Sequence, residues 1–104
     1  MSDTVKNIET AAGLLADATV AEMQLEDHRA VVKLTAIDRI MRSGDNPMTG
    51  KAHSFSSAEA MVNTDEEYQN YLAKIRDAVR QRILARGSYD ASLAAARLKE
   101  VAGV

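Results

Sequence analysis

The chain has 104 residues, of which 46% are hydrophobic and only 4% aromatic, and it contains no cysteine. This length suffices for one domain with a modest core, and the missing cysteine excludes disulfides, thiolate metal sites and thiol nucleophiles. A formal net charge of −2 gives no support to a protein that holds nucleic acid through its total positive charge.

The apolar content is almost wholly aliphatic and alanine, which favours helix packing over a β-sandwich. We therefore predict one all-α domain over residues 1–104, folded as a long antiparallel helical hairpin. Its first arm covers about 3–43, its bend 44–56 and its second arm about 57–102. The N-terminal residues lack a signal-peptide pattern, and Asp17, Thr19 and Glu22 interrupt the apolar stretch 11–23, so we expect a cytoplasmic protein without a membrane contact.

The first arm carries apolar side chains at steps of three and four, which predicts an amphipathic helix of roughly 40 residues. The stripe consists of Val5, Ile8, Ala12, Leu15, Thr19, Met23, Ala30, Leu34, Ile37 and Met41. Ser2 or Asp3 is the expected N-cap, and Gly44 is the expected C-terminal stop. A helix of this length is either bent at Gly13 or extended and paired along its length.

Glu26 and Asp27 interrupt this stripe in the middle of the first arm. A polar layer there would fix the register of a helix pair, at a cost in stability. A local kink or an exposed patch explains the same two residues, and both interpretations stay open.

The bend is rich in residues that favour turns. The run Asp45-Asn46-Pro47 favours turn initiation and Gly50 permits a positive φ. The Gly50-Lys51 pair does not predict a phosphate loop, because the spacing from Gly44 is one residue too long, Ala52 replaces the magnesium-binding Ser or Thr, and no strand precedes it. We expect a connection whose exposed side chains could bind a partner protein or an anion, namely Lys51, His53, Ser54 and Phe55, with Ser56 and Ser57 beside them.

Two capping boxes follow the bend. Ser56 with Glu59, preceded by Phe55, predicts a short helix to about Val62, and Thr64 with Glu67 predicts a longer one. The stripe of the longer helix is Tyr68, Leu72, Ile75, Val79 and Ile83. We expect Gly87 to end this helix and Ser88 to cap a last helix that carries Leu93, Ala94, Leu98 and Val101.

The charges predict that the arms run antiparallel. Residues 1–27 hold six acids and one base, whereas residues 74–86 hold five bases and one acid. Nearer the bend the signs are reversed, since 29–42 is mainly basic and 59–67 is acidic. An antiparallel hairpin places each block beside its opposite, although the same blocks could also pair between two chains.

No set of residues predicts chemistry. His28 has no second histidine or cysteine at helical spacing, and no nucleophile and base can be paired from the sequence. We therefore expect no catalytic residue, no metal and no cofactor, and hence a non-enzymatic protein.

Apolar side chains beyond a single seam predict self-association into a bundle; they are Leu14, Val20, Leu25, Val32 and Leu84. Our first hypothesis is a helical interaction or assembly protein that binds itself and another protein. The alternative is a nucleic-acid-binding accessory protein that uses the basic face of residues 74–86, through Arg76, Arg80, Arg82 and Arg86.

One segment resembles the linker of small helical proteins encoded by bacteriophages and prophages; it reads NPMTGKAHSFSSAEAMV. It follows RIMRSGD and precedes DEEYQNYLAKI. Their linker reads Asn-Pro-x-Thr-Gly-Lys-x-His-Ser-x-Ser-Ser-Ala-Glu between two helical arms. The matching residues are Asn46, Pro47, Thr49, Gly50, Lys51, His53, Ser54, Ser56, Ser57, Ala58 and Glu59. The resemblance implies a phage accessory or assembly protein in the bacterial cytoplasm, and it implies no particular activity.

Overall fold

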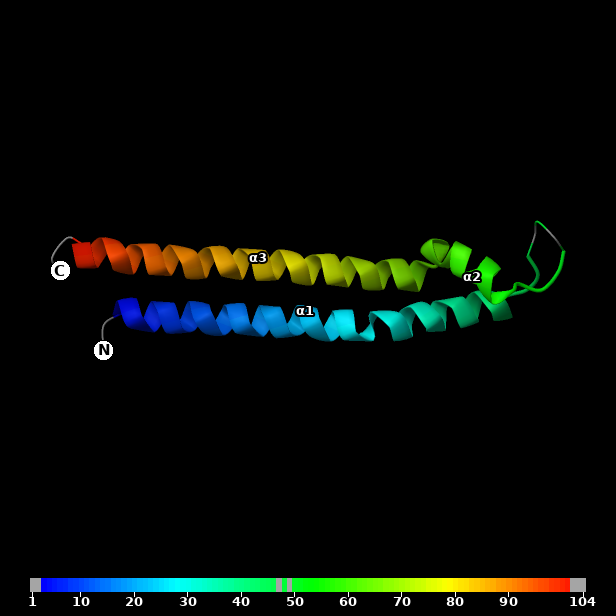
Figure 1. The fold of residues 1–104 in the computed structure, drawn as a ribbon, viewed down its shortest axis with the longest axis horizontal. Helices are drawn as coiled ribbons and strands as arrows, with labels where there is room; N and C mark the ends of the chain where they lie inside the picture. Colours follow the sequence, from blue (N-terminus) through cyan, green and yellow to red (C-terminus); the bar gives the residue numbers. More distant parts are fainter. Residues whose placement is uncertain (1–2, 47, 49, 102–104) are drawn as a thin grey trace. The chain divides into compact units, whose positions relative to one another are not determined.

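The computed structural model describes residues 3–46, 48 and 50–101, which are helical apart from a connecting loop with one isolated β-bridge (Figure 1). Helix α1 spans Asp3–Arg42, α2 spans Phe55–Met61, the 3-10 helix η1 spans Val62–Thr64, and α3 spans Glu66–Val101. The predicted all-α class and the short linker helix are confirmed. Ser2, Pro47 and Thr49, which the sequence analysis singled out, lie outside the described residues.

The chain divides into two compact units, and α1 and α3 contribute to both. The terminal unit combines Met1–Gln24 with Arg76–Val104, and the bend unit is Leu25–Ile75.

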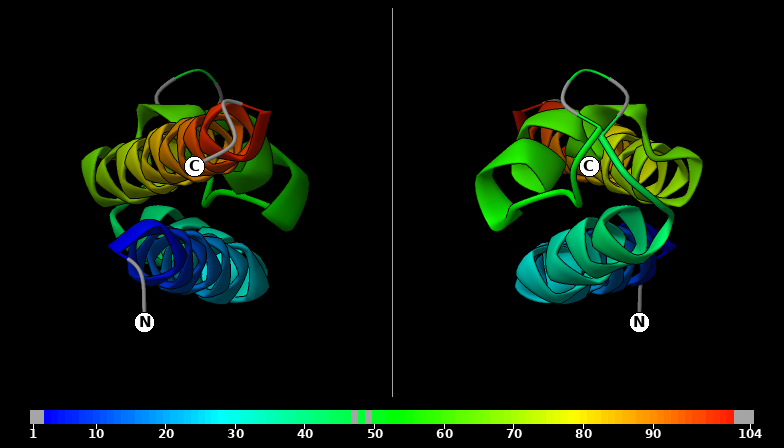
Figure 2. Two further views of the ribbon diagram at one scale, coloured as in Figure 1. Left: turned by 90° about the vertical axis from the view of Figure 1, so that its left-hand side faces the viewer. Right: turned by 90° about the vertical axis from the view of Figure 1, so that its right-hand side faces the viewer.

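In the terminal unit α1 and α3 run antiparallel (Figure 2). Lys99 Nζ donates to Thr4 Oγ1 at 2.8 Å, and Arg82 Nε donates to Glu22 Oε2 at 2.5 Å. The buried and half-buried side chains recur at alternating steps of three and four, which is the spacing of a heptad seam. On α1 they include Thr4, Ile8, Ala11, Leu15, Ala18 and Glu22, and on α3 Ala78, Arg82, Ala85, Tyr89, Ser92 and Ala96. Small residues therefore dominate this seam.

The bend unit holds the larger core, because α2 and η1 add to the pair of long helices. Its buried cluster consists of Ala36, Ile37, Ala58, Val62 and Tyr68, with Val32, Ile40 and Leu72 packed against it. The helices again run antiparallel, since Tyr71 Oη donates to the carbonyl of Leu25 while Arg39 reaches Asp65. The antiparallel hairpin predicted from the charges is thus confirmed in each unit.

Both predicted capping boxes are displaced. Ser54, not Ser56, caps α2, because its Oγ accepts from the Ser57 N–H at 3.1 Å. The earlier start places Ser57 in the first turn of α2, where its hydroxyl contacts the loop. Phe55 consequently lies inside the helix and not at the staple position.

Asp65, not Thr64, caps α3, since Asp65 Oδ2 accepts from the Tyr68 N–H at 2.9 Å. The 3-10 turn draws Thr64 into η1, where its hydroxyl donates to the carbonyl of Met61. Asp65 then has the extended ψ of 120° that an N-cap requires.

The predicted break at Gly87 is wrong, and α3 continues to Val101. A helical glycine costs only about 1 kcal/mol relative to alanine, and residues 91–100 are mostly strong helix formers. Ser88 lies inside the helix, and its carbonyl accepts from Ser92 Oγ. The first arm likewise passes through Gly13 without a break.

The predicted stop at Gly44 is confirmed. Helix α1 ends at Arg42, and Gly44 has a φ of +128°, which disfavours residues with a side chain. The Ser43 N–H and hydroxyl both donate to the carbonyl of Ile40, which closes the last turn.

The predicted stripes are only partly buried. Ile8, Leu15, Ile37, Tyr68 and Ile75 face inward, whereas these members are exposed: Met23, Ala30, Leu34, Met41, Ile83, Ala94, Leu98 and Val101. The seam of the terminal unit also includes Glu22 and Arg82, which the periodicity of apolar residues does not identify. Glu26 and Asp27 are exposed, so the exposed-patch interpretation is the correct one.

Candidate interaction surfaces

The loop between α1 and α2 is ordered around Asn46. The Asn46 N–H donates to the Lys51 carbonyl at 2.7 Å, the Gly50 N–H donates to the Asn46 carbonyl at 2.8 Å, and the Met48 N–H donates to Asn46 Oδ1 at 2.9 Å. Gly50 has the expected positive φ of +70°, and Asp45 and Ala52 form the isolated bridge. Backbone hydrogen bonds therefore join Asn46 to Gly50 and Lys51 across this loop.

The four predicted loop residues fall into two groups. His53 is buried, and its Nδ1 lies 3.0 Å from Ser57 Oγ, which also accepts from Asn46 Nδ2 at 3.0 Å. Because Ser57 accepts from Asn46, its own proton is available to Nδ1 of a neutral His53. Ser54 caps α2, so it and His53 hold the loop on the helix.

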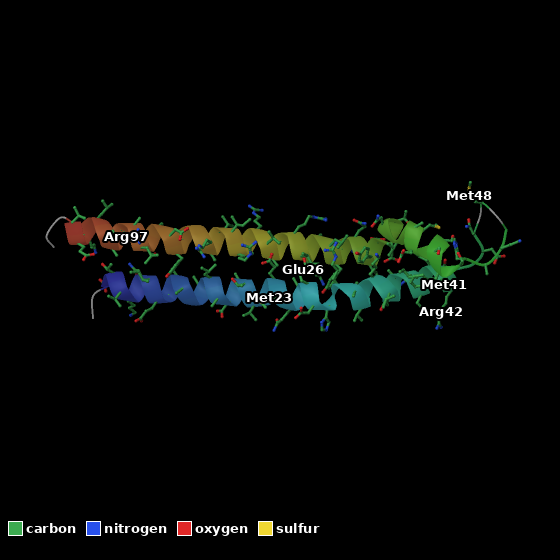
Figure 3. The ribbon with its side chains drawn as sticks, in the orientation of Figure 1. Met23, Glu26, Met41, Arg42, Met48 and Arg97 are labelled. Atoms are coloured by element: carbon green, nitrogen blue, oxygen red, sulfur yellow. The ribbon has the colours of Figure 1, made fainter. Side chains whose placement is uncertain are left out.

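Lys51 in the loop and Phe55 at the start of α2 are exposed. Met48, labelled in Figure 3, is 90% exposed on the loop. These three are the longest exposed side chains described in the bend. Met48 was not predicted, because a single methionine among turn residues carries no periodic signal.

The basic residues after position 74 do not share one free face. In the terminal unit, Arg82 lies in the helix seam against Glu22, and Arg86 Nε lies 3.5 Å from Asp90 Oδ1 one turn later. Arg76 and Arg80 are exposed on α3. Of the four predicted arginines, Arg82 is therefore half-buried in the seam, while Arg76, Arg80 and Arg86 are exposed and Arg86 lies beside Asp90.

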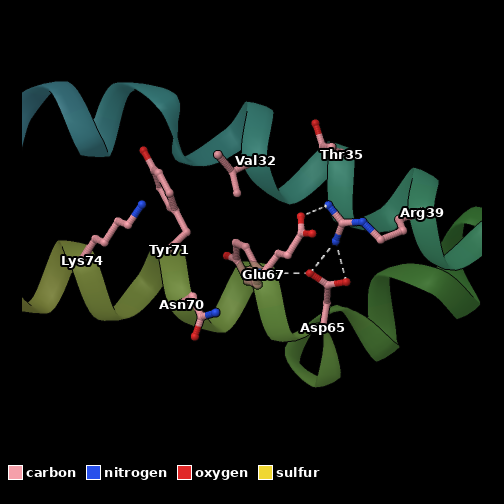
Figure 4. A pocket seen from close by; sticks show the side chains of 9 residues that line it. Val32, Thr35, Arg39, Asp65, Glu67, Asn70, Tyr71 and Lys74 are labelled. Carbon is pink, nitrogen blue, oxygen red and sulfur yellow. Dashed lines mark hydrogen bonds and ion pairs between the residues drawn. The ribbon is translucent and has the colours of Figure 1, made fainter.

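A shallow pocket of about 450 Å³ lies between α1 and α3 in the bend unit (Figure 4). Its lining consists of Val32, Thr35, Arg39, Asp65, Glu67, Tyr68, Asn70, Tyr71 and Lys74. Arg39 Nη1 donates to both oxygens of Asp65 at 2.6 and 2.7 Å, and Nη2 donates to Glu67 at 2.6 Å. The sequence analysis did not identify this pocket, although it did predict the opposite charges that line it.

The Arg39 guanidinium holds the pKa of the Asp65 carboxyl below its usual value, and the Tyr68 N–H acts in the same direction. Asp65 thus stays ionised and engaged as a helix cap and ion-pair partner. The ion pairs of this pocket join α1 to the start of α3.

Large apolar side chains are exposed in the terminal unit. On α1 they are Val5, Leu14, Val20 and Met23, and on α3 they are Ile83, Leu84, Leu98 and Val101. The buried hydrophobic residues of this unit, among those described, are Ala11 and Ala78. Its largest apolar side chains are therefore exposed or half-buried.

No helix within the described ranges is long and apolar enough to cross a bilayer. Among the same residues, no three of His, Cys, Asp and Glu come together in a cluster that would hold a metal ion. No protein-family description matches the chain, and searches of curated proteins and of solved structures likewise gave no match.

Proposed function

We propose that this protein is a non-enzymatic helical interaction protein that self-associates and serves assembly. One observation carries the proposal: the terminal unit exposes eight large apolar side chains, from Val5 to Val101, while its buried hydrophobic residues are alanines. Exposed apolar surface marks an interaction site when its side chains gather into a patch. Two helices alone bury little, and further copies of the chain supply the missing partners.

The resemblance of residues 46–59 to phage and prophage proteins supports an accessory or assembly role in the bacterial cytoplasm. The exposed side chains of the loop, Met48, Lys51 and Phe55, offer a second contact for another protein. Self-association and partner capture then use different parts of the chain.

Sedimentation equilibrium from low to high micromolar concentration tests the self-association. We expect a mass that rises above that of one chain as concentration increases. A protein that stays monomeric at high micromolar concentration would contradict the proposal.

A second candidate function is nucleic-acid binding, and the exposed Arg76 and Arg80 support it. Fluorescence anisotropy with single-stranded and double-stranded DNA at low salt tests it. Binding that weakens steeply with added salt and is lost in the double variant R76A/R80A would favour this function. No binding at low salt, together with self-association, favours the interaction protein.

A further inference from the structure

The outer side of α3 in the terminal unit carries a second heptad pattern, on the side opposite the seam with α1. Its positions are Leu84, Gly87, Ala91, Ala94, Leu98 and Val101, with Ile83 beside them, and all are exposed. The alternating steps of three and four make a straight stripe along a helix. Leu98 is 71% exposed and Val101 is 86% exposed, so the terminal unit leaves the largest members of this stripe uncovered.

We propose that a second copy of this chain covers this stripe, with the two α3 helices packed antiparallel about a two-fold axis. This interface rests on the self-association proposed above and gives it a location and a register. Leu84 of one copy lies opposite Val101 of the second copy, Gly87 lies opposite Leu98, and Ala91 lies opposite Ala94. Symmetry repeats each layer on the other side of the axis.

The sizes of the side chains suit this register. The central layers contain alanine on both sides, which lets the two backbones approach closely. In the next layer outward, Gly87 leaves room for the leucine opposite it. The outermost layers pair two branched aliphatic side chains, so the ends of the interface bury the most apolar surface.

The charged residues beside the stripe also suit the proposed register. Asp90 and Arg97 occupy equivalent positions along one edge of the stripe, one heptad apart, and both are exposed. In an antiparallel pair these edges face each other, and the proposed register brings Asp90 of one copy beside Arg97 of the other, twice. Within the part of the chain that the structure describes, Arg97 forms no ion pair, and Asp90 contacts only Arg86 on its own helix, at 3.5 Å. The opposite edge carries Ser88 and Ala95, which bring no like charges together.

Registers shifted by one heptad in either direction pair the side chains less favourably. A shift that places Ala91 opposite Gly87 brings Asp90 beside its own copy and sets Arg80 against Leu98. A shift in the other direction, with Ala94 opposite Leu98, brings Arg97 beside its own copy. A parallel pair would set Asp90 beside the neutral Ala95. Like charges that face each other disfavour both shifted registers, and only the proposed one pairs Asp90 with Arg97.

Substitution of single residues tests which surface associates. Leu98→Glu places a charge in the stripe and should weaken self-association roughly a hundredfold or more in sedimentation equilibrium. The effect is large because both copies carry the substitution in a two-fold interface. Ala16→Glu is the matched control on the exposed side of α1 in the same unit, and it should change the dissociation constant by less than about threefold, as for a residue outside the interface. Far-UV circular dichroism checks that both variants remain helical.

Disulfide crosslinking tests the register, and the chain offers a cysteine-free background. Leu84→Cys mixed with Val101→Cys should give a crosslinked dimer under mild oxidation. Neither variant alone should do so, because the two positions lie about 25 Å apart along one helix. A dimer crosslinked efficiently by Leu84→Cys alone would show parallel packing and overturn the proposal.

These experiments test the α3 interface separately from the self-association of the chain. A wild-type protein that stays monomeric would overturn both the α3 interface and the self-association. An oligomer that survives Leu98→Glu would overturn the α3 interface and leave self-association standing. Reversed charges give a last check: Asp90→Arg and Arg97→Asp should each weaken the dimer severalfold, and the double variant should regain most of the loss.

Discussion

The terminal unit and the bend unit use the same two long helices and bury them very differently. In the bend unit, α2 and η1 supply Ala58 and Val62 against Ile37 of α1. The terminal unit has no such additional helix among its described residues, and its seam is closed mainly by alanines and by the Glu22–Arg82 pair. The added short helix gives the bend unit a core with large buried side chains, although Val31 and Leu34 stay exposed there as well. The buried hydrophobic residues described in the terminal unit are Ala11 and Ala78.

The comparison also separates two roles. Polar groups in the bend unit serve the fold: Asp65 caps α3 and binds Arg39, and His53 is fastened to Ser57. The terminal unit instead exposes Leu84, Leu98 and Val101 in a regular pattern. We therefore expect folding stability to depend mostly on the bend unit and association mostly on the terminal unit.

The largest effect should follow Ile37→Ala in the bend unit. Ile37 is 2% exposed, and its truncation leaves a cavity that should cost about 2–5 kcal/mol in the free energy of unfolding, measured by urea denaturation. Leu34→Ala on the same helix is the control, because Leu34 is 55% exposed and should change stability by less than about 0.5 kcal/mol. Equal losses of unfolding free energy in the two variants would show that the buried Ile37 contributes no more to stability than the exposed Leu34.

Ala11→Leu tests whether the alanine seam of the terminal unit is closely packed. Ala11 is buried, so a larger side chain should force the helices apart and cost about 1–3 kcal/mol. The matched control is Ala16→Leu on the exposed side of α1, which should be nearly neutral in thermal unfolding. A stabilising Ala11→Leu would mean that the seam holds unfilled space.

Asp65→Ala should destabilise the bend unit through its helix cap. Loss of the bond from the Tyr68 N–H should cost about 0.5–2 kcal/mol. Thr64→Ala is the control, because the Thr64 hydroxyl donates to Met61 and caps nothing. If Thr64→Ala proved the more damaging change, the capping box read from the sequence would be right after all.

Gly13→Ala should stabilise the terminal unit by about 1 kcal/mol, because the helix is continuous there and an added Cβ meets nothing within 4 Å. Gly44→Ala should do the opposite and lower stability by about 1 kcal/mol or more, since its φ is positive. Thermal unfolding followed by circular dichroism measures both. Destabilisation by Gly13→Ala would indicate a bend at that residue.

The smallest effect should be the pH dependence contributed by Asp65. Its pKa is lower in the folded chain than the usual 3.8, so its stabilisation is complete above that value. It should be lost as the pH falls from about 4 through the folded pKa. Urea titrations at several pH values should show a weaker acid dependence for Asp65→Asn than for the wild type, and an unchanged profile would show that the Arg39 contact contributes nothing.

Much of the fold could be predicted from local signals. Gly44 ends α1 as expected because a positive φ is needed there, and the blocks of opposite charge predicted the antiparallel pairing that Glu22–Arg82 and Arg39–Asp65 display. The caps were harder. Ser54 and Ser56 have the same capping chemistry, and only the contacts of Ser57 with Asn46 and His53 decide between them.

The candidate sites were predicted less well. Of the residues predicted to bind a partner, Lys51 and Phe55 are exposed, as a binding site requires. His53 is buried, and the spacing of residues in the sequence does not reveal the turn that buries it. The basic run was visible in the sequence, but the contact of Arg82 with Glu22 depends on which side of α3 faces α1. The sequence pattern identifies only Leu84 of the outer stripe as an apolar residue beyond the seam, because the expected break at Gly87 assigns Leu98 and Val101 to a separate helix.

By itself, the sequence determined the helical class, the stop at Gly44 and the orientation of the arms, because propensity, glycine conformation and charge act over a few residues or along whole segments. Only the tertiary structure decided which of several apolar stripes on each helix is buried. Both stripes of α3 in the terminal unit have the same heptad spacing, and the smaller side chains of Ala78 and Ala85 allow the close approach to α1. The larger side chains of Leu84 and Leu98 are left facing outward for that steric reason, and there we expect a second copy to bind.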